Sequence, residues 1–140
     1  MRLVSNHPSS VHLILITLFF AISSCSRLEC SPPEPLGMKT IELGSAVDES
    51  SHIVSPTRVF APGDDVHASI ELTGSGSATV TVQWLADNHV VSTEARAIRA
   101  TEHDRVAFHF APPGGWPVGR NSIVFWMDPV EKHVAEFDVQ

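Results

Sequence analysis

The sequence predicts an all-β sandwich, and three observations support this prediction. Several short stretches alternate between apolar and polar residues with a period of two, which is typical of strands that bury one face. Clusters of Gly, Pro, Asn and Asp separate these stretches at intervals of roughly 8–12 residues, as in other sandwiches. No stretch beyond the N-terminal leader shows the apolar period of an amphipathic helix. We therefore expect about seven short antiparallel strands in two packed sheets.

The clearest pair of strands is expected at the C-terminal end. A turn rich in proline and glycine, residues 111–118, contains Trp116 with a proline close on either side, and this excludes a helix. The strand that follows is opened by Gly119. Its predicted inward face consists of Asn121, Ile123, Phe125 and Met127, and its outward face of Ser122, Val124 and Trp126. Residues 134–139 are expected to pair with this strand as a hairpin through Asp128-Pro129.

The remaining strands are expected upstream of this pair. Residues 38–47 alternate weakly, and residues 57–60 form a short strand that ends at the Pro62-Gly63 turn. Residues 65–73 alternate cleanly. Their apolar members are expected in the core: Val66, Ala68, Ile70 and Leu72. Three further segments are expected to be strands: 78–86, one or two short edge strands within 90–98, and 105–110.

Two tryptophans bear on the type of sandwich. Trp84 has the same phase as Val80 and Val82, so it faces the core from a middle strand. A core tryptophan at that place is typical of immunoglobulin-like domains, and we therefore predict an immunoglobulin-like antiparallel sandwich. Trp116 either packs beneath its own turn or stands exposed as a surface aromatic.

The N-terminal residues 1–24 are predicted to be a lipoprotein signal peptide. The apolar run 11–22 has roughly 12 residues, whereas a helix needs about 20 to span a bilayer. Residues 21–25 (AISSC) resemble the lipobox of bacterial lipoproteins. That resemblance implies lipid attachment to Cys25, cleavage before it and acylation of the new amino terminus, so that several acyl chains anchor the protein. Ordinary secretory cleavage is the alternative. Ser26 implies sorting to the outer membrane, facing the periplasm.

After the lipidated cysteine, residues 25–37 are predicted to be a proline-rich tether, and residues 38–140 the sandwich domain. Removal of the leader with Arg2 leaves eight basic and sixteen acidic side chains, a formal charge of −8. An acidic chain without a basic cluster argues against binding to nucleic acid or to anionic lipid surfaces. Cys30 then has no partner for an intramolecular disulfide, so the domain depends on its core.

Several short motifs resemble those of one group of proteins: small envelope proteins and lipoproteins of Proteobacteria, each with a single immunoglobulin-like domain and mostly of unknown function. They include Leu43-Gly44, the Phe60-x-Pro62-Gly63-Asp64 turn, Trp84, Gly115-Trp116-Pro117-x-Gly119 and Phe137-x-Val139. The resemblance implies a fold and an envelope location, but no activity. One position departs from the pattern, because Asn121 stands where such domains carry a corner tyrosine. Either its amide replaces the tyrosine hydroxyl, or the corner is looser.

Two histidines are candidates for a metal site. The segments 65–73 and 105–110 correspond to the second and fifth strands of an immunoglobulin-like sandwich, which are antiparallel neighbours. A register that sets Glu71 opposite Arg105 also sets Ser69 opposite Ala107 and His67 opposite His109. Cross-strand partners have β-carbons about 5 Å apart, so the two imidazoles can share a metal ion. Zinc needs a third ligand, which the sequence does not indicate, and the alternative is a pair of exposed polar side chains.

Catalytic motifs are missing from the sequence. No serine lies in a nucleophile elbow, and His103-Asp104 reads as a loop. The glycines at 74–77 lie between two strands, with no helix behind them to bind a phosphate. We therefore predict a protein that is not an enzyme and needs no cofactor.

An apolar patch is expected on the outward face of the sheet that carries Trp84, which is predicted to have three strands. Four residues form it: Leu85, Val124, Trp126 and Val134. Exposed apolar patches with an aromatic centre often mark interfaces. The predicted function is therefore a lipid-anchored interaction or accessory module that docks an envelope protein through this face. The alternatives are metal binding or sensing by His67 and His109, and a structural role through self-association by the same patch.

Overall fold

The computed structural model describes residues 31–101 and 103–140. The predicted signal peptide and residues 25–30 of the tether, Cys25 included, lie outside the described residues. Residues 32–140 form one compact unit. All regular secondary structure in the described part of the chain is β-strand, which confirms the all-β prediction. Over the same residues, no helix is long and apolar enough to cross a membrane.

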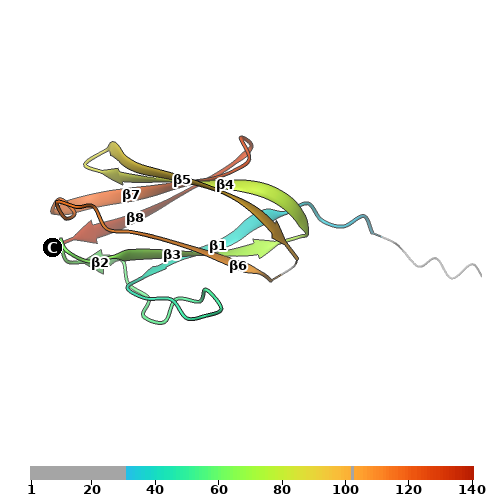
Figure 1. Cartoon of the computed structure of the whole chain (residues 1–140), viewed down its shortest axis with the longest axis horizontal. Helices are drawn as coiled ribbons and strands as arrows, with labels where there is room; N and C mark the ends of the chain where they lie inside the picture. Colours follow the sequence, from blue (N-terminus) through green and yellow to red (C-terminus); the bar gives the residue numbers. More distant parts are fainter. Residues whose placement is uncertain (1–30, 102) are drawn as a thin grey trace, which may run out of the picture. The chain divides into compact units, whose positions relative to one another are not determined.

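In the described part of the chain, eight strands form two sheets, which Figure 1 shows as two layers. They are β1 (Gly37–Gly44), β2 (Val59–Phe60), β3 (Val66–Thr73), β4 (Gly76–Ala86), β5 (His89–Ala100), β6 (Arg105–Phe110), β7 (Gly119–Met127) and β8 (Glu131–Val139). One sheet has three strands in the order β1-β3-β6. The other has five in the order β2-β8-β7-β4-β5. All neighbours are antiparallel except β2 and β8, which are parallel.

The core lies between the two sheets, and the period-two alternation explains which side chains fill it. The predicted inward residues of β3, β4 and β7 are all buried, at 3% exposure or less. Phe108 of β6 and Phe137 of β8 close the core from the two sheets, each about 1% exposed. Burial of these side chains supplies most of the free energy that holds the sheets together, at roughly 25 cal/mol per Å² of apolar surface.

Trp116 packs beneath its own turn, so the exposed alternative is wrong. Its side chain is 2% exposed, and its indole Nε1 donates a hydrogen bond to the Asp64 carbonyl at 3.1 Å. The Trp116 ring lies 5.0 Å from that of Phe137 and 6.2 Å from that of Trp84. Gly115 makes this close packing possible, because its φ of +78° suits glycine and a Cβ there would meet the Pro62 carbonyl oxygen at 2.9 Å. The turn and the core are therefore one packed unit.

Asn121 resolves the question of the missing tyrosine. It is 3% exposed, and its amide nitrogen donates to the carbonyl oxygens of Pro117 at 3.0 Å and Gly119 at 3.2 Å. Its side-chain oxygen accepts from the Asp87 backbone N–H at 3.2 Å. The amide thus satisfies three backbone groups and joins the start of β7 to the β4–β5 turn, so the corner is not loose.

Three predictions about strands need correction. The region expected to hold one or two short edge strands is a single strand of twelve residues, β5. Among the described strands it pairs with β4 alone, at the edge of the sheet. Most of its residues on both faces are exposed, so a clear apolar alternation is not required. The sheet expected to have three strands has five, because β5 and the two-residue β2 extend its edges. The domain also begins earlier than residue 38, since Pro35 bridges to Ser75 and Leu36 packs on the core.

The exposed faces carry ion pairs that the alternation predicts. The predicted register of β3 and β6 is confirmed, with Glu71 opposite Arg105 and 3.3 Å between carboxylate and guanidinium. A hydrogen bond from the Lys39 ammonium lowers the pKa of Glu71 below its ordinary value, and the charges of Lys39 and Arg105 add to this effect. A lowered pKa means that the carboxylate stabilises the fold above its ordinary pKa and loses that contribution as the pH falls below it.

Candidate functional sites

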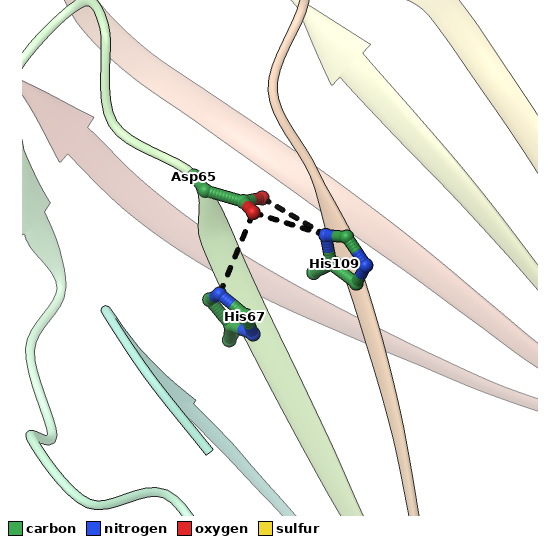
Figure 2. A group of neighbouring side chains, drawn as sticks. All are labelled: Asp65, His67 and His109. Atoms are coloured by element: carbon green, nitrogen blue, oxygen red, sulfur yellow. Dashed lines mark hydrogen bonds and ion pairs between the residues drawn. The ribbon is translucent and has the colours of Figure 1, made fainter.

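The register of β3 and β6 brings the predicted histidine pair together. His67 lies directly opposite His109, as expected from the sequence. Their rings stack almost parallel, with centroids 5.1 Å apart and planes inclined by 17°. Figure 2 shows both rings on the same side of the two strands. This face of the three-stranded sheet is the outer one, because Val66 and Ala68 on either side of His67 are fully buried in the core.

A carboxylate completes the cluster, and sequence reasoning missed it. Asp65 precedes β3, and Figure 2 shows its carboxylate pointing toward both imidazoles. Its Oδ2 lies 3.0 Å from His109 Nδ1 and 3.5 Å from His67 Nε2. A third potential donor therefore accompanies the two histidines, although the sequence did not indicate one. The signal was the spacing of two between Asp65 and His67, which places both on one face of an extended chain.

Burial distinguishes the three members of this cluster. The His67 side chain is 17% exposed, that of Asp65 42% and that of His109 66%. The loop between β1 and β2 lies against the same sheet, since the Ser69 hydroxyl beside His67 donates to the Ser51 carbonyl and Ser69 is fully buried. His67 Nδ1 is buried and has no hydrogen-bond partner among the described residues. The cluster is thus open to solvent on the His109 side and closed on the His67 side.

The predicted docking patch lies on the outer face of the five-stranded sheet. Val124 of β7 is opposite Gln83 of β4 and Val134 of β8, and Leu85 is one step along β4, opposite Ser122. Leu85, Val124 and Trp126 are half-buried, and Val134 is 54% exposed. These four residues form the docking face. Polar Gln83 and Ser122 lie among them on the same side of the sheet. Trp126 is less exposed than the sequence suggests, because the Lys132 ammonium lies over its ring, 5.1 Å from the centroid.

Polar groups surround the docking face on two sides. At one end, Arg120 lies 3.9 Å from Glu136 and 3.7 Å from Asp138. At the other end a shallow groove lies beside Trp126, with further lining from Thr79, Thr81, Asp128 and Pro129. An apolar centre within a polar rim is the usual anatomy of a protein interface. The groove was not foreseen, because it depends on where the β7–β8 turn lies relative to β4.

The comparisons with known proteins bear on the fold alone. No family model and no curated protein matches the chain. Among solved structures, it is similar to part of a β-glucosidase from Erythrobacter marinus, at 11% identity and a TM-score of 0.52, over 76% of this chain and 15% of that one. A β-glucosidase from Listeria innocua, in complex with gluconolactone, matches at 12% identity and a TM-score of 0.48, over 76% and 16%. The chain therefore spans about a sixth of the length of these enzymes, and the first match supports a shared arrangement of strands.

Proposed function

We propose that this protein is a lipid-anchored, non-enzymatic module of the bacterial cell envelope that docks another envelope protein through the outer face of its five-stranded sheet. The fold type in this proposal is an immunoglobulin-like sandwich. It is supported by the adjacency of β3 and β6 in one sheet, of β4, β7 and β8 in the other, and by the buried Trp84. The resemblance to small proteobacterial lipoproteins supports the same fold type.

The location in this proposal rests on the sequence. The AISSC motif supports lipidation of Cys25 and anchoring in a membrane, and Ser26 supports the outer membrane, facing the periplasm. The domain begins at about residue 32, so only a few residues separate it from the anchor. A short tether keeps the domain near the membrane surface, where its partner is expected.

The observation that carries the proposal is the docking face itself. Four apolar side chains lie on one side of three adjacent strands, with Val124 directly opposite Val134. Ion pairs frame them at one end, and the groove beside Trp126 frames them at the other. Tryptophan is the side chain most often found at the energetic centre of an interface. The Trp126 ring is half-buried under the flexible Lys132 side chain, so rotation of that lysine side chain exposes the ring to a partner.

Charge favours a different protein over a second copy as the partner. The whole chain carries a formal charge of −7, and two acidic copies repel each other at close range. A partner with an apolar side chain for the groove and basic groups near Asp128 and Glu136 matches both parts of the face. The similarity to β-glucosidases covers a small part of those enzymes, and no glycosidase activity is proposed for this chain.

Photo-crosslinking in living cells tests this proposal. A photoreactive amino acid replaces Trp126 in the full-length chain, which reaches the membrane through its own Cys25. We expect one discrete adduct, larger than the monomer, whose second component is identified by mass spectrometry. An adduct at twice the monomer mass would instead indicate self-association and would contradict a foreign partner.

A matched control uses Val54, which is 61% exposed and lies in the loop that covers the other sheet. Crosslinking from this position is expected to give no such adduct. The same adduct from Val54 as from Trp126, or no adduct from either, would show that the docking face has no special role.

A further inference from the structure

We propose that Asp65, His67 and His109 form a binding site for a divalent transition-metal ion such as Zn²⁺. This site lies on the three-stranded sheet and does not depend on the docking face of the other sheet. Among the described residues, these three are the one group of histidine, cysteine and acidic side chains with three ligand atoms mutually within 4.8 Å. Two imidazoles and one carboxylate are a donor set that zinc accepts readily.

The spacing of the donor atoms matches a tetrahedral ion. Zinc binds nitrogen and carboxylate oxygen at about 2.0–2.2 Å, so its ligand atoms lie about 3.3–3.5 Å from one another. The Asp65 Oδ2 is 3.0 Å from His109 Nδ1 and 3.5 Å from His67 Nε2, which brackets that value. The separation between the two histidine nitrogens is within 4.8 Å, and the stacked rings can close on an ion by rotation of their side chains.

A simple ion pair does not explain the whole arrangement. Asp65 with His109 alone accounts for the 3.0 Å contact at the surface. It leaves unexplained why the less exposed His67 directs its Nε2 toward the same carboxylate oxygen. Three groups that converge on one point are what a bound cation requires.

The same features predict an exchangeable ion with an open coordination position. Structural zinc sites have four protein ligands, whereas this one offers three and is exposed at His109. When His67 binds a metal through Nε2, its single N–H proton lies on Nδ1, where none of the described residues accepts it. Metal-binding histidines usually have such an acceptor, and its absence weakens the affinity. The fold does not need the ion, because a continuous apolar core holds the sheets together.

Zinc titration of the purified, lipidated full-length protein in detergent tests the proposal, with Zn²⁺ in competition with a chromogenic chelator. All variants carry Cys30→Ser, which removes a thiol that also binds zinc. We expect one saturable equivalent of Zn²⁺ per chain. His67→Ala and His109→Ala are each expected to abolish it, and Asp65→Asn to weaken it clearly, because the amide is a poorer ligand. His89→Ala, on the other sheet, is the matched control and is expected to bind as the parent does.

A second measurement separates loss of a ligand from loss of the fold. In ¹⁵N-histidine NMR spectra of the parent, Zn²⁺ is expected to shift the ring nitrogens of His67 and His109, while those of His89 and His133 stay in place. His109 is exposed, so His109→Ala is expected to keep the parent's circular dichroism spectrum while losing the ion. The proposal is overturned if the parent binds no stoichiometric zinc, or if His67→Ala and His109→Ala both bind it as the parent does.

Discussion

Replacement of Trp116 by alanine is expected to lower the free energy of unfolding by about 3–5 kcal/mol, the range for removal of a large buried aromatic side chain. The ring is 2% exposed and contacts Phe137, Trp84 and Phe110, whose ring centroids lie 5.0–6.2 Å away. Its indole N–H also holds the Asp64 carbonyl at the turn before β3. The change therefore opens a cavity and releases a turn together. Urea unfolding followed by circular dichroism measures the loss.

Trp126→Ala is the matched control, since it removes the same side chain from the docking face. That ring is half-buried and packs under a lysine rather than in the core. A loss of about 1 kcal/mol is expected, as for a partly exposed substitution. Equal losses for the two variants would mean that Trp116 is not part of the core.

Asn121→Ala is expected to cost about 1–3 kcal/mol, although it removes no apolar surface. The amide satisfies the carbonyls of Pro117 and Gly119 and the N–H of Asp87, at a position that is 3% exposed. Alanine leaves these groups near a small void without partners. Thermal unfolding is a suitable measurement, since 1 kcal/mol shifts the midpoint of a domain of this size by roughly 4–8 °C.

The neighbouring Ser122→Ala provides the comparison for Asn121. Ser122 points to the other face of β7 and is half-buried there, and none of the described hydrogen bonds involves its hydroxyl group. Its replacement is expected to change stability by less than about 0.5 kcal/mol. Identical unfolding midpoints for the Asn121 and Ser122 variants would show that water forms hydrogen bonds with the three backbone groups as well as the Asn121 amide does.

Much of the fold could be predicted because the alternation fixes which face of each strand is buried. In 65–73 and 105–110, a slip of one residue would expose Ile70 and Phe108. It would also turn Glu71 and His109 toward the core. Because buried residues must stay buried, the two strands can shift relative to each other only by two residues at a time. The opposite charges of Glu71 and Arg105 then favour the register that places them opposite each other. The resulting register, with His67 opposite His109, is the one observed.

Other parts of the fold carry no such signal. β5 is an edge strand with both faces largely in solvent, so its sequence does not need to alternate, and its length could not be predicted. Arg96 even turns its guanidinium onto the Phe108 ring, 4.4 Å from its centroid, at a position that a simple pattern assigns to an apolar residue. The pairing of β2 with β8 joins segments about 80 residues apart and involves two residues. The local sequence of either segment therefore does not predict this pairing.

In the candidate sites, too, some features follow from the alternation of the strands and others depend on tertiary packing. The histidine pair follows from the register, which the sequence predicts. Asp65 has the same phase as His67, so its spacing was a usable signal, but it directly follows the Pro62-Gly63-Asp64 turn, where the direction of a side chain also depends on tertiary packing. The outward phase of Leu85, Val124 and Trp126 follows from alternation, whereas the cover that Lys132 gives to the tryptophan is a matter of side-chain conformation.

The most direct test of the central claim is whether the docking face is covered in the envelope. Val134→Cys and Val54→Cys, each in a Cys30→Ser background, place one thiol on the docking face and one on the loop over the other sheet, at parent side chains that are 54% and 61% exposed. Their rates of reaction with a polar maleimide are compared in the purified protein and in cells with a permeabilised outer membrane. We predict similar rates for the two thiols in the purified protein, and protection of residue 134 alone in cells. Equal labelling of both positions in cells would contradict docking through this face.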